Sequence, residues 1–133
     1  MASPTAYRLS VILVAVNKKT TDELRLNIMK KLKGFQRKYL RGLANTLDPV
    51  VFVGKQGVTD AIIDAVDEAM DARELVKIRF VEFKKERKEL AAVIEERTHS
   101  EMVGMIGHVA IFYREQPDED KRSIALPTES RGG

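Results

Sequence analysis

A short loop bounded by two glycines contains the residues of this sequence best suited to binding a ligand. In residues 53–59, Gly54 and Gly57 enclose Lys55 and Gln56. Glycine lets a backbone approach a ligand closely because it has no Cβ. The free N–H groups of the helix predicted after the loop favour a phosphate, and Lys55 adds a positive charge. The loop therefore suggests an anion site, although short glycine loops also serve simply to turn a chain.

Positive charge is concentrated immediately before this loop. Residues 24–47 contain seven Lys or Arg and no Asp or Glu. A solvated helix ordinarily pairs its cations with acidic residues three or four positions away. The absence of such partners favours an anion-binding surface, and Gly-x-x-Gly loops clamp nucleic-acid backbones in KH modules. The candidate cations that accompany the loop are Lys30, Lys31, Lys33, Arg37, Lys38 and Arg41.

Other kinds of chemistry have little support in the composition. The 133 residues include no cysteine and two histidines, which excludes disulfide scaffolds, Cys-ligated zinc and cysteine nucleophiles. His99 and His108 lack a nucleophile partner and are expected in turns. Residues 48–74 hold seven acidic and two basic residues, but the acids surround a helix without a coordination loop. We expect a solvated acidic helix, no metal, no cofactor and no enzymatic activity; an adaptor that binds proteins through this helix stays an alternative.

Hydrophobic periodicity predicts an α/β domain with interleaved helices and strands. The predicted order is a helix over residues 36–47, a strand over 50–53, a helix with Thr59 as its N-cap, a strand over 75–80, a helix over 85–97, and strands over 102–106 and 109–113 joined at Gly107-His108. The apolar run 50–53 is typical of a strand buried on both faces. Tyr39 belongs to the apolar stripe of the first helix and is expected in the core, as are Met102 and Met105. With Phe35 and Tyr39 the only aromatic neighbours of the basic zone, we expect little base stacking.

As an ordered set, several segments resemble the CRM domain, named for chloroplast RNA splicing and ribosome maturation. They are residues 36–41 (QRKYLR), 48–59 (DPVVFVGKQGVT) and 74–78 (ELVKI), with further similarity at 106–108 and 112–114. The chain is most similar to the stand-alone bacterial YhbY-like form of this domain.

This resemblance implies a four-stranded mixed sheet with packed helices, similar to the C-terminal domain of the third bacterial initiation factor. It also implies RNA binding through the Gly54–Gly57 loop and the neighbouring basic surface, without catalysis. For the stand-alone form it implies ribosomal RNA in precursors of the large ribosomal subunit as the partner. An RNA chaperone or a splicing-type module is the alternative. His99 stands where the family often has glycine.

We divide the chain into an N-terminal extension (residues 1–28), a CRM-like RNA-binding domain (29–114) and a charged tail (115–133) whose end is expected to be disordered. Residues 9–16 form an apolar run, which we interpret as a strand or a loosely attached extension rather than a signal peptide. No window approaches the roughly 20 apolar residues of a membrane span. We therefore expect a cytoplasmic monomer with no membrane and no small-molecule substrate.

Overall fold

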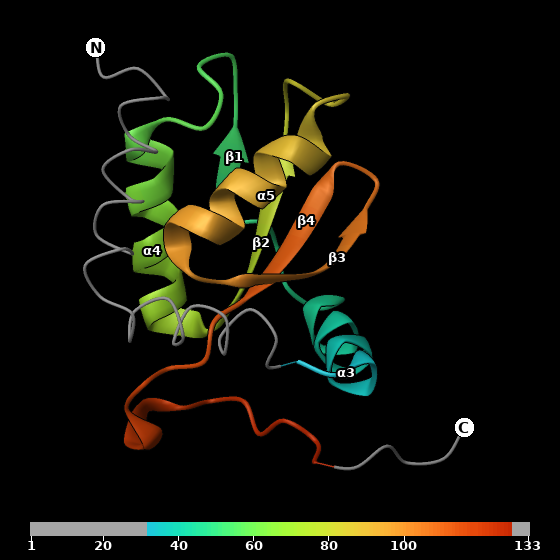
Figure 1. Ribbon diagram of the computed structural model, residues 1–133, viewed down its shortest axis with the longest axis vertical. Coiled ribbons are helices and arrows are strands. Elements are labelled where there is room, and N and C mark those ends of the chain that lie inside the picture. Colours follow the sequence, from blue (N-terminus) through green and yellow to red (C-terminus); the bar gives the residue numbers. More distant parts are fainter. Residues whose placement is uncertain (1–31, 129–133) are drawn as a thin grey trace, which may run out of the picture. The chain divides into compact units, whose positions relative to one another are not determined.

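The computed structural model describes residues 32–128. The predicted extension 1–28, Lys30, Lys31 and the tail end 129–133 lie outside these residues. Within them, helices and strands follow one another in the predicted order (Figure 1). The elements are α3 (Gly34–Ala44), β1 (Val51–Val53), α4 (Asp60–Arg73), β2 (Leu75–Phe80), α5 (Arg87–Thr98), β3 (Glu101–Ile106) and β4 (Val109–Tyr113), followed by a short 3₁₀ helix (Glu119–Lys121).

The four strands form one mixed sheet in the order β1-β2-β4-β3. β1 pairs with β2 in parallel, whereas β4 pairs antiparallel with both β2 and β3. Gly107 has a φ of 59° in the turn that joins β3 to β4, at the predicted hairpin position. The α/β fold class and the four-stranded mixed sheet predicted from the sequence are confirmed.

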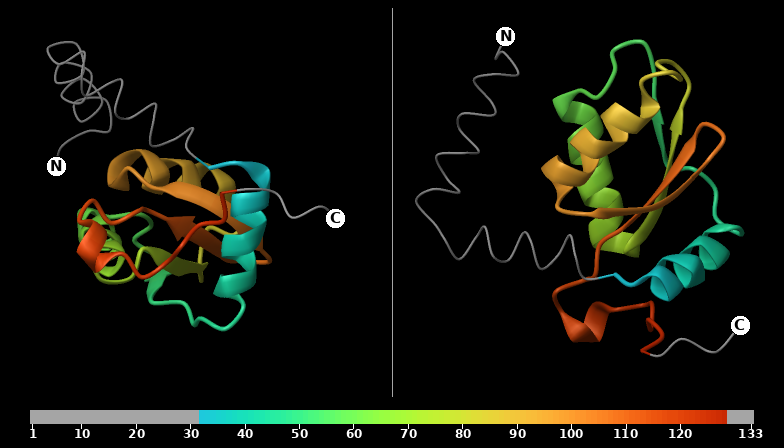
Figure 2. Two further views of the ribbon diagram at one scale, coloured as in Figure 1. Left: turned by 90° about the horizontal axis from the view of Figure 1, so that it is seen from below. Right: turned by 45° about the vertical axis from the view of Figure 1, so that its right-hand side comes forward.

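Both faces of the sheet are covered, each by different helices (Figure 2). On β2, Val76, Ile78 and Phe80 point to the first face and pack against α4 and α5. Leu75 points to the second face and packs against α3. This alternation is the period-2 pattern that predicted the strand. Met102 and Met105 pack against the first-face core, as expected.

The first helix buries a narrower stripe than its sequence predicts. α3 ends at Ala44, three residues before the predicted end, and it buries Leu40 and Ala44 against the sheet. Tyr39 is 41% exposed, so its predicted place in the core is wrong. A contact centred on the 40/44 row of one helix face leaves position 39 beside the contact rather than in it.

The strand predicted to be buried on both faces is also different. β1 is an edge strand, and Val51 and Val53 are buried beneath α4 while Phe52 is 52% exposed. Phe52 points to the second face, where α3 packs against β2, β3 and β4. A wholly apolar run of this length therefore did not distinguish a central strand from an edge strand with one covered face.

The segment after β4 is attached to the domain through a buried glutamate. Glu74 follows α4 and is 2% exposed. Its Oε1 accepts hydrogen bonds from Ser123 N at 2.7 Å and Ile124 N at 3.2 Å, and its Oε2 accepts one from Gln116 N at 2.9 Å. Burial by itself raises the pKa of Glu74, but these hydrogen bonds outweigh it, and the pKa is lowered from its usual value of 4.5. Ile124 and Leu126 then pack against the second-face core.

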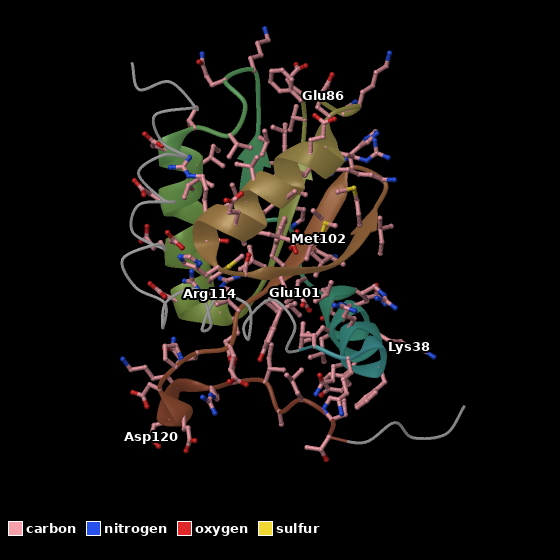
Figure 3. The ribbon with its side chains drawn as sticks, viewed as in Figure 1. Lys38, Glu86, Glu101, Met102, Arg114 and Asp120 are labelled. Atoms are coloured by element: carbon pink, nitrogen blue, oxygen red, sulfur yellow. The ribbon has the colours of Figure 1, made fainter. Side chains whose placement is uncertain are left out.

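Two arginines from neighbouring elements pair with carboxylates of α4, which changes the picture of a freely solvated acidic helix. Arg114, at the end of β4, lies 2.7 Å from Asp67 Oδ1 and 2.9 Å from Asp71 Oδ1 on α4 (Figure 3). Its Nη1 also donates to the carbonyl of Thr98. Arg97 of α5 pairs with Asp60 at the start of α4. Several carboxylates of α4 thus hold helices and strands together.

Replacing the carboxylate of Glu74 should release the segment after β4. We expect Glu74→Gln to lower the free energy of unfolding at pH 7 by about 2 kcal/mol, because an amide cannot accept from all the donors that meet the carboxylate. The folded pKa lies below that of the unfolded chain, so this contribution is complete above the unfolded pKa and is lost as pH falls through the folded pKa. The difference between wild type and variant, measured by urea unfolding, should therefore shrink on acidification. A difference that grows at low pH would contradict this.

The residue that ends α5 has a left-handed backbone. His99 has a φ of 54° and a ψ of 42°, and its exposed side chain follows the last turn of the helix. Glycine adopts this conformation without the steric cost that a Cβ brings.

We therefore expect His99→Gly to stabilise the domain by up to about 1 kcal/mol, as measured by thermal or urea unfolding. His99→Ala is the matched control, since it also removes the imidazole but keeps the Cβ. Equal effects of the two substitutions would show that backbone conformation is not the cause.

Candidate nucleic-acid interface

The parallel pairing of β1 and β2 brings two loops together at one edge of the sheet. The glycine loop (residues 54–57) leaves the carboxyl end of β1, and the lysine segment (residues 81–86) leaves the carboxyl end of β2. Val81 N and Glu82 N donate to the carbonyl of Val53 at 2.9 Å and 3.1 Å. These bonds fix the start of the lysine segment beside the start of the glycine loop. In open α/β sheets, ligands bind at the carboxyl ends of the strands.

The glycine loop is a tight turn that leads into α4. Gly57 N donates to the carbonyl of Gly54 at 3.0 Å, and Gly57 has a φ of 73°. Thr59 then begins the helix, its side-chain oxygen accepting a hydrogen bond from Ile62 N at 3.1 Å, so the predicted N-cap is confirmed. Lys55 and Gln56 are exposed at the tip of the turn. The loop thus presents its polar side chains outward from a fixed backbone.

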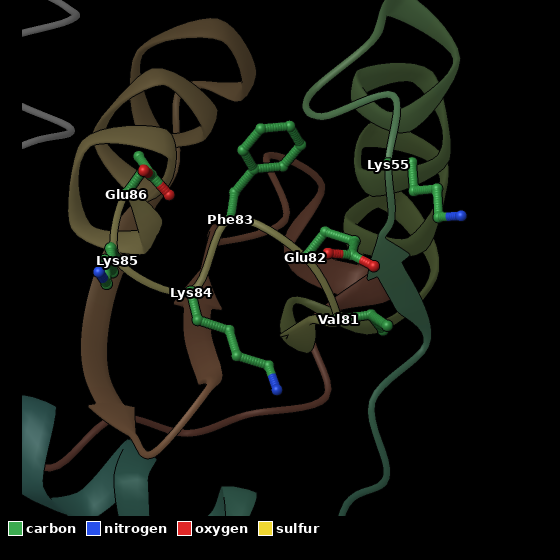
Figure 4. A pocket seen from close by; sticks show the side chains of 7 residues that line it. All are labelled: Lys55, Val81, Glu82, Phe83, Lys84, Lys85 and Glu86. Atoms are coloured by element: carbon green, nitrogen blue, oxygen red, sulfur yellow. The ribbon is translucent and has the colours of Figure 1, made fainter.

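A groove of about 510 Å³ lies between the glycine loop and the lysine segment (Figure 4). We call it the strand-end groove. Its walls are formed by Lys55, Val81, Glu82, Phe83, Lys84, Lys85 and Glu86. A volume of this size is within the range of pockets that hold small ligands or parts of larger ones.

The charges around the strand-end groove favour an anion. Lys55, Lys84 and Lys85 are exposed, and among residues 32–128 no carboxylate forms an ion pair with any of them. Glu82 and Glu86 are the two acids that line the groove. Unpaired ammonium groups beside a backbone turn are suited to phosphate oxygens, which they meet as point charges.

The structure separates the two parts of the predicted site. The glycine loop lies at the carboxyl end of β1, whereas α3 lies at the other end of the domain on the second face (Figures 1 and 2). Lys33 and Lys38 are exposed, and Lys38 projects from α3 far from Glu86 of the groove (Figure 3). The basic residues of α3 are therefore not neighbours of the glycine loop.

Two of the predicted RNA-binding cations make contacts inside the domain. Arg37 Nε lies 3.3 Å from Oε2 of the buried Glu101 on β3. Arg41 Nη1 donates to the carbonyl of Val103 at 2.9 Å. The stem of Arg41 also covers Gly104, where a Cβ would lie only 2.6 Å from Arg41 Cδ. These contacts attach α3 to β3.

Glu101 is the buried partner of this ion pair, because its side chain is 7% exposed while that of Arg37 is 40% exposed. Burial raises the pKa of Glu101, the positive charge of Arg37 lowers it, and the negative charge of Glu95 raises it further. The net direction is upward from 4.5. Arg37 therefore stabilises a carboxylate that would otherwise be costly to bury.

Sequence reasoning missed the lysine segment. Residues 75–97 hold seven basic and five acidic residues, so this zone did not stand out beside the acid-free zone 24–47. Their place in the chain could have revealed them, because Lys84 and Lys85 follow one predicted strand as the glycine loop follows another. If these two strands pair in parallel, the residues after each strand meet at the same edge of the sheet. Phe83 was missed for the same reason.

The sequence profile of the CRS1/YhbY (CRM) domain matches residues 32–114. The chain belongs to this family. The match begins two residues before α3 and ends with Arg114, so it includes all four strands, the glycine loop and the lysine segment. The resemblance inferred from the sequence is confirmed.

Two relatives match this chain over nearly their whole length, and one solved structure shares its fold. The chain is 33% identical over 97 residues to the Bacillus subtilis protein named "Probable RNA-binding protein YqeI", covering 72% of this chain and 99% of the relative. It is 35% identical over 101 residues to a Haemophilus influenzae protein named "RNA-binding protein", covering 74% and 98%. The solution structure of SAV1595 from Staphylococcus aureus superposes with a TM-score of 0.63 at 37% identity, covering 72% and 99%.

Residues 32–128 offer neither a metal-binding cluster nor a membrane-spanning helix. These residues contain no cluster of three or more His, Asp or Glu side chains arranged to hold a metal ion. None of their helices has the length and apolar character needed to cross a bilayer.

The two glycines of the loop should respond differently to alanine. Gly57→Ala places a Cβ on a residue with positive φ and should lower the free energy of unfolding by about 1 kcal/mol or more. Gly54→Ala is the control, because nothing lies within 4 Å of its new Cβ and its φ is not in the left-handed region; we expect a change below about 0.5 kcal/mol. Urea unfolding measures both, and equal losses would contradict the assigned turn.

Proposed function

We propose that this protein binds RNA at the strand-end groove, with Lys55, Lys84 and Lys85 contacting phosphates and the glycine loop approaching the backbone. Membership of the CRM family and the names of its relatives support RNA as the ligand. The observation that carries the proposal is the groove itself. Two loops tied by backbone hydrogen bonds hold three unpaired lysines around one cavity at the carboxyl ends of parallel strands.

The RNA we propose is ribosomal RNA in precursors of the large ribosomal subunit. The likeness to the stand-alone, YhbY-like form of the domain supports this choice, since the relatives match over nearly their whole length. The protein would act in the cytoplasm as a monomeric, non-enzymatic assembly factor. Its contribution would be binding, with phosphate contacts supplying most of the affinity.

Charge reversal in the groove should weaken RNA binding more than the same change on α3. We expect Lys55→Glu combined with Lys84→Glu to reduce affinity about tenfold and to lower the salt slope by roughly 1.5, since each lost phosphate contact removes about 0.7–0.9. Lys38→Glu combined with Lys33→Glu is the matched control, because it makes the same charge change on exposed residues away from the groove. Fluorescence anisotropy over a salt series measures both.

Equal losses in the two double variants would contradict the groove as the binding site. They would assign the affinity to net charge or to α3, as the sequence first suggested. Circular dichroism of each variant shows whether the fold is kept.

Sedimentation of a cell extract tests the identity of the RNA. The tagged protein should migrate with particles lighter than mature large subunits, and ribonuclease treatment should return it to the top of the gradient. Migration with small subunits, or none with any ribosomal particle, would refute the assembly role without refuting RNA binding.

A further inference from the structure

An exposed aromatic ring lies in the strand-end groove. Phe83 is 42% exposed, whereas Phe80 and Phe112 are fully buried in the core. Its Cε2 atom is 3.7 Å from the position that a Cβ on Gly57 would take, so the ring borders the glycine loop. Figure 4 shows the Phe83 ring on the side of its segment opposite to the Lys84 side chain, with the Lys55 side chain pointing away from the ring. An apolar ring thus lies in the wall of a groove that also carries three lysines.

The backbone holds Phe83 in a conformation that aromatic residues rarely adopt. Its φ is 56°, in the left-handed region that favours glycine. The residue is enclosed by hydrogen bonds on both sides, from Glu82 N to the carbonyl of Val53 and from Glu86 N to the carbonyl of Phe83. A strained backbone of this kind persists only where surrounding contacts hold it in place, and such residues are frequent at ligand-binding sites. The strain has no evident benefit to the core, because the ring is exposed.

We propose that Phe83 stacks on an unpaired base, so that the strand-end groove selects single-stranded RNA over a duplex. This inference rests on the proposed RNA-binding function and adds to it the kind of RNA that the site takes. Aromatic rings combined with a basic groove are the arrangement by which proteins bind single strands. A base within a duplex cannot offer its face to a side chain, because both faces are covered by neighbouring base pairs.

The lysines around the ring favour RNA over an apolar protein partner as its occupant. Val81, the other exposed apolar side chain of the groove, belongs to the same segment as Phe83, Lys84 and Lys85. A protein surface docking here would have to bury these ammonium groups or pair them. A nucleotide offers phosphates to the lysines and a flat apolar face to the ring at the same time.

Fluorescence of a labelled RNA tests the stacking directly. The probe is an oligouridine of about 12 nucleotides with one central 2-aminopurine, free or annealed to its complement. Stacking on Phe83 should quench the 2-aminopurine when wild-type protein binds the single strand. Phe83→Leu should abolish the quenching and lower single-strand affinity between about 5- and 150-fold, while duplex affinity stays unchanged. Phe83→Tyr should retain both quenching and affinity.

Phe52→Leu is the matched control. Phe52 is another exposed phenylalanine, on β1, and does not line the groove. We expect it to leave quenching and affinity at wild-type values. An equal effect of Phe52→Leu and Phe83→Leu would overturn the assignment of the stacking ring.

The other outcomes separate this inference from the proposed function. In one of them, wild type binds single strands in a salt-dependent way without quenching, and Phe83→Leu binds them equally well. This result would overturn the stacking role but leave RNA binding in place. Phe83 and Val81 would then form a surface for a protein partner. Binding of neither single strand nor duplex by wild type would overturn both proposals. The quenching in wild type needs no variant, so a failure of Phe83→Leu to fold would not prevent the test.

Discussion

The parallel pairing of β1 with β2 is the constraint on which the candidate site depends. Parallel strands end at the same edge, so the loop after each strand meets the other there. The carbonyl of Val53 accepts two hydrogen bonds from the start of the lysine segment and continues the pairing beyond the strands. Residues separated by α4 and by the whole of β2 are thereby placed around one groove.

The burial of both sheet faces explains why the basic zone is divided between two ends of the domain. α4 and α5 cover the first face, and α3 is needed to cover Leu75, Ile111 and other apolar residues of the second. Attaching α3 engages Arg37 with Glu101 and Arg41 with a carbonyl of β3. Part of the positive charge that attracts attention in the sequence thus serves to attach a helix.

Local patterns predicted the elements well, and long-range contacts account for what they missed. The alternation over residues 75–80, the Thr59 cap and the Gly107-His108 turn are properties of neighbouring residues, and each was found as expected. Exposure of Tyr39 and Phe52 depends on which part of each face a helix covers, and no local pattern encodes that. The acidic partner of Arg37 comes from β3 rather than from its own helix. The absence of acidic residues nearby in the sequence therefore did not show that Arg37 is unpaired. The lysine segment could have been found only by pairing β1 with β2 first.

The buried carboxylate of Glu74 also bears on how the protein is made. A nascent chain that has reached Arg114 already contains every strand of the sheet. Yet Gln116, Ser123 and Ile124, which supply the N–H groups that satisfy the carboxylate, have not been synthesised. A buried charge without donors is costly, and the apolar surface that Ile124 and Leu126 cover is still open. Native packing of the second face is therefore completed only after translation has passed the end of the sheet, and until then part of its apolar surface stays uncovered.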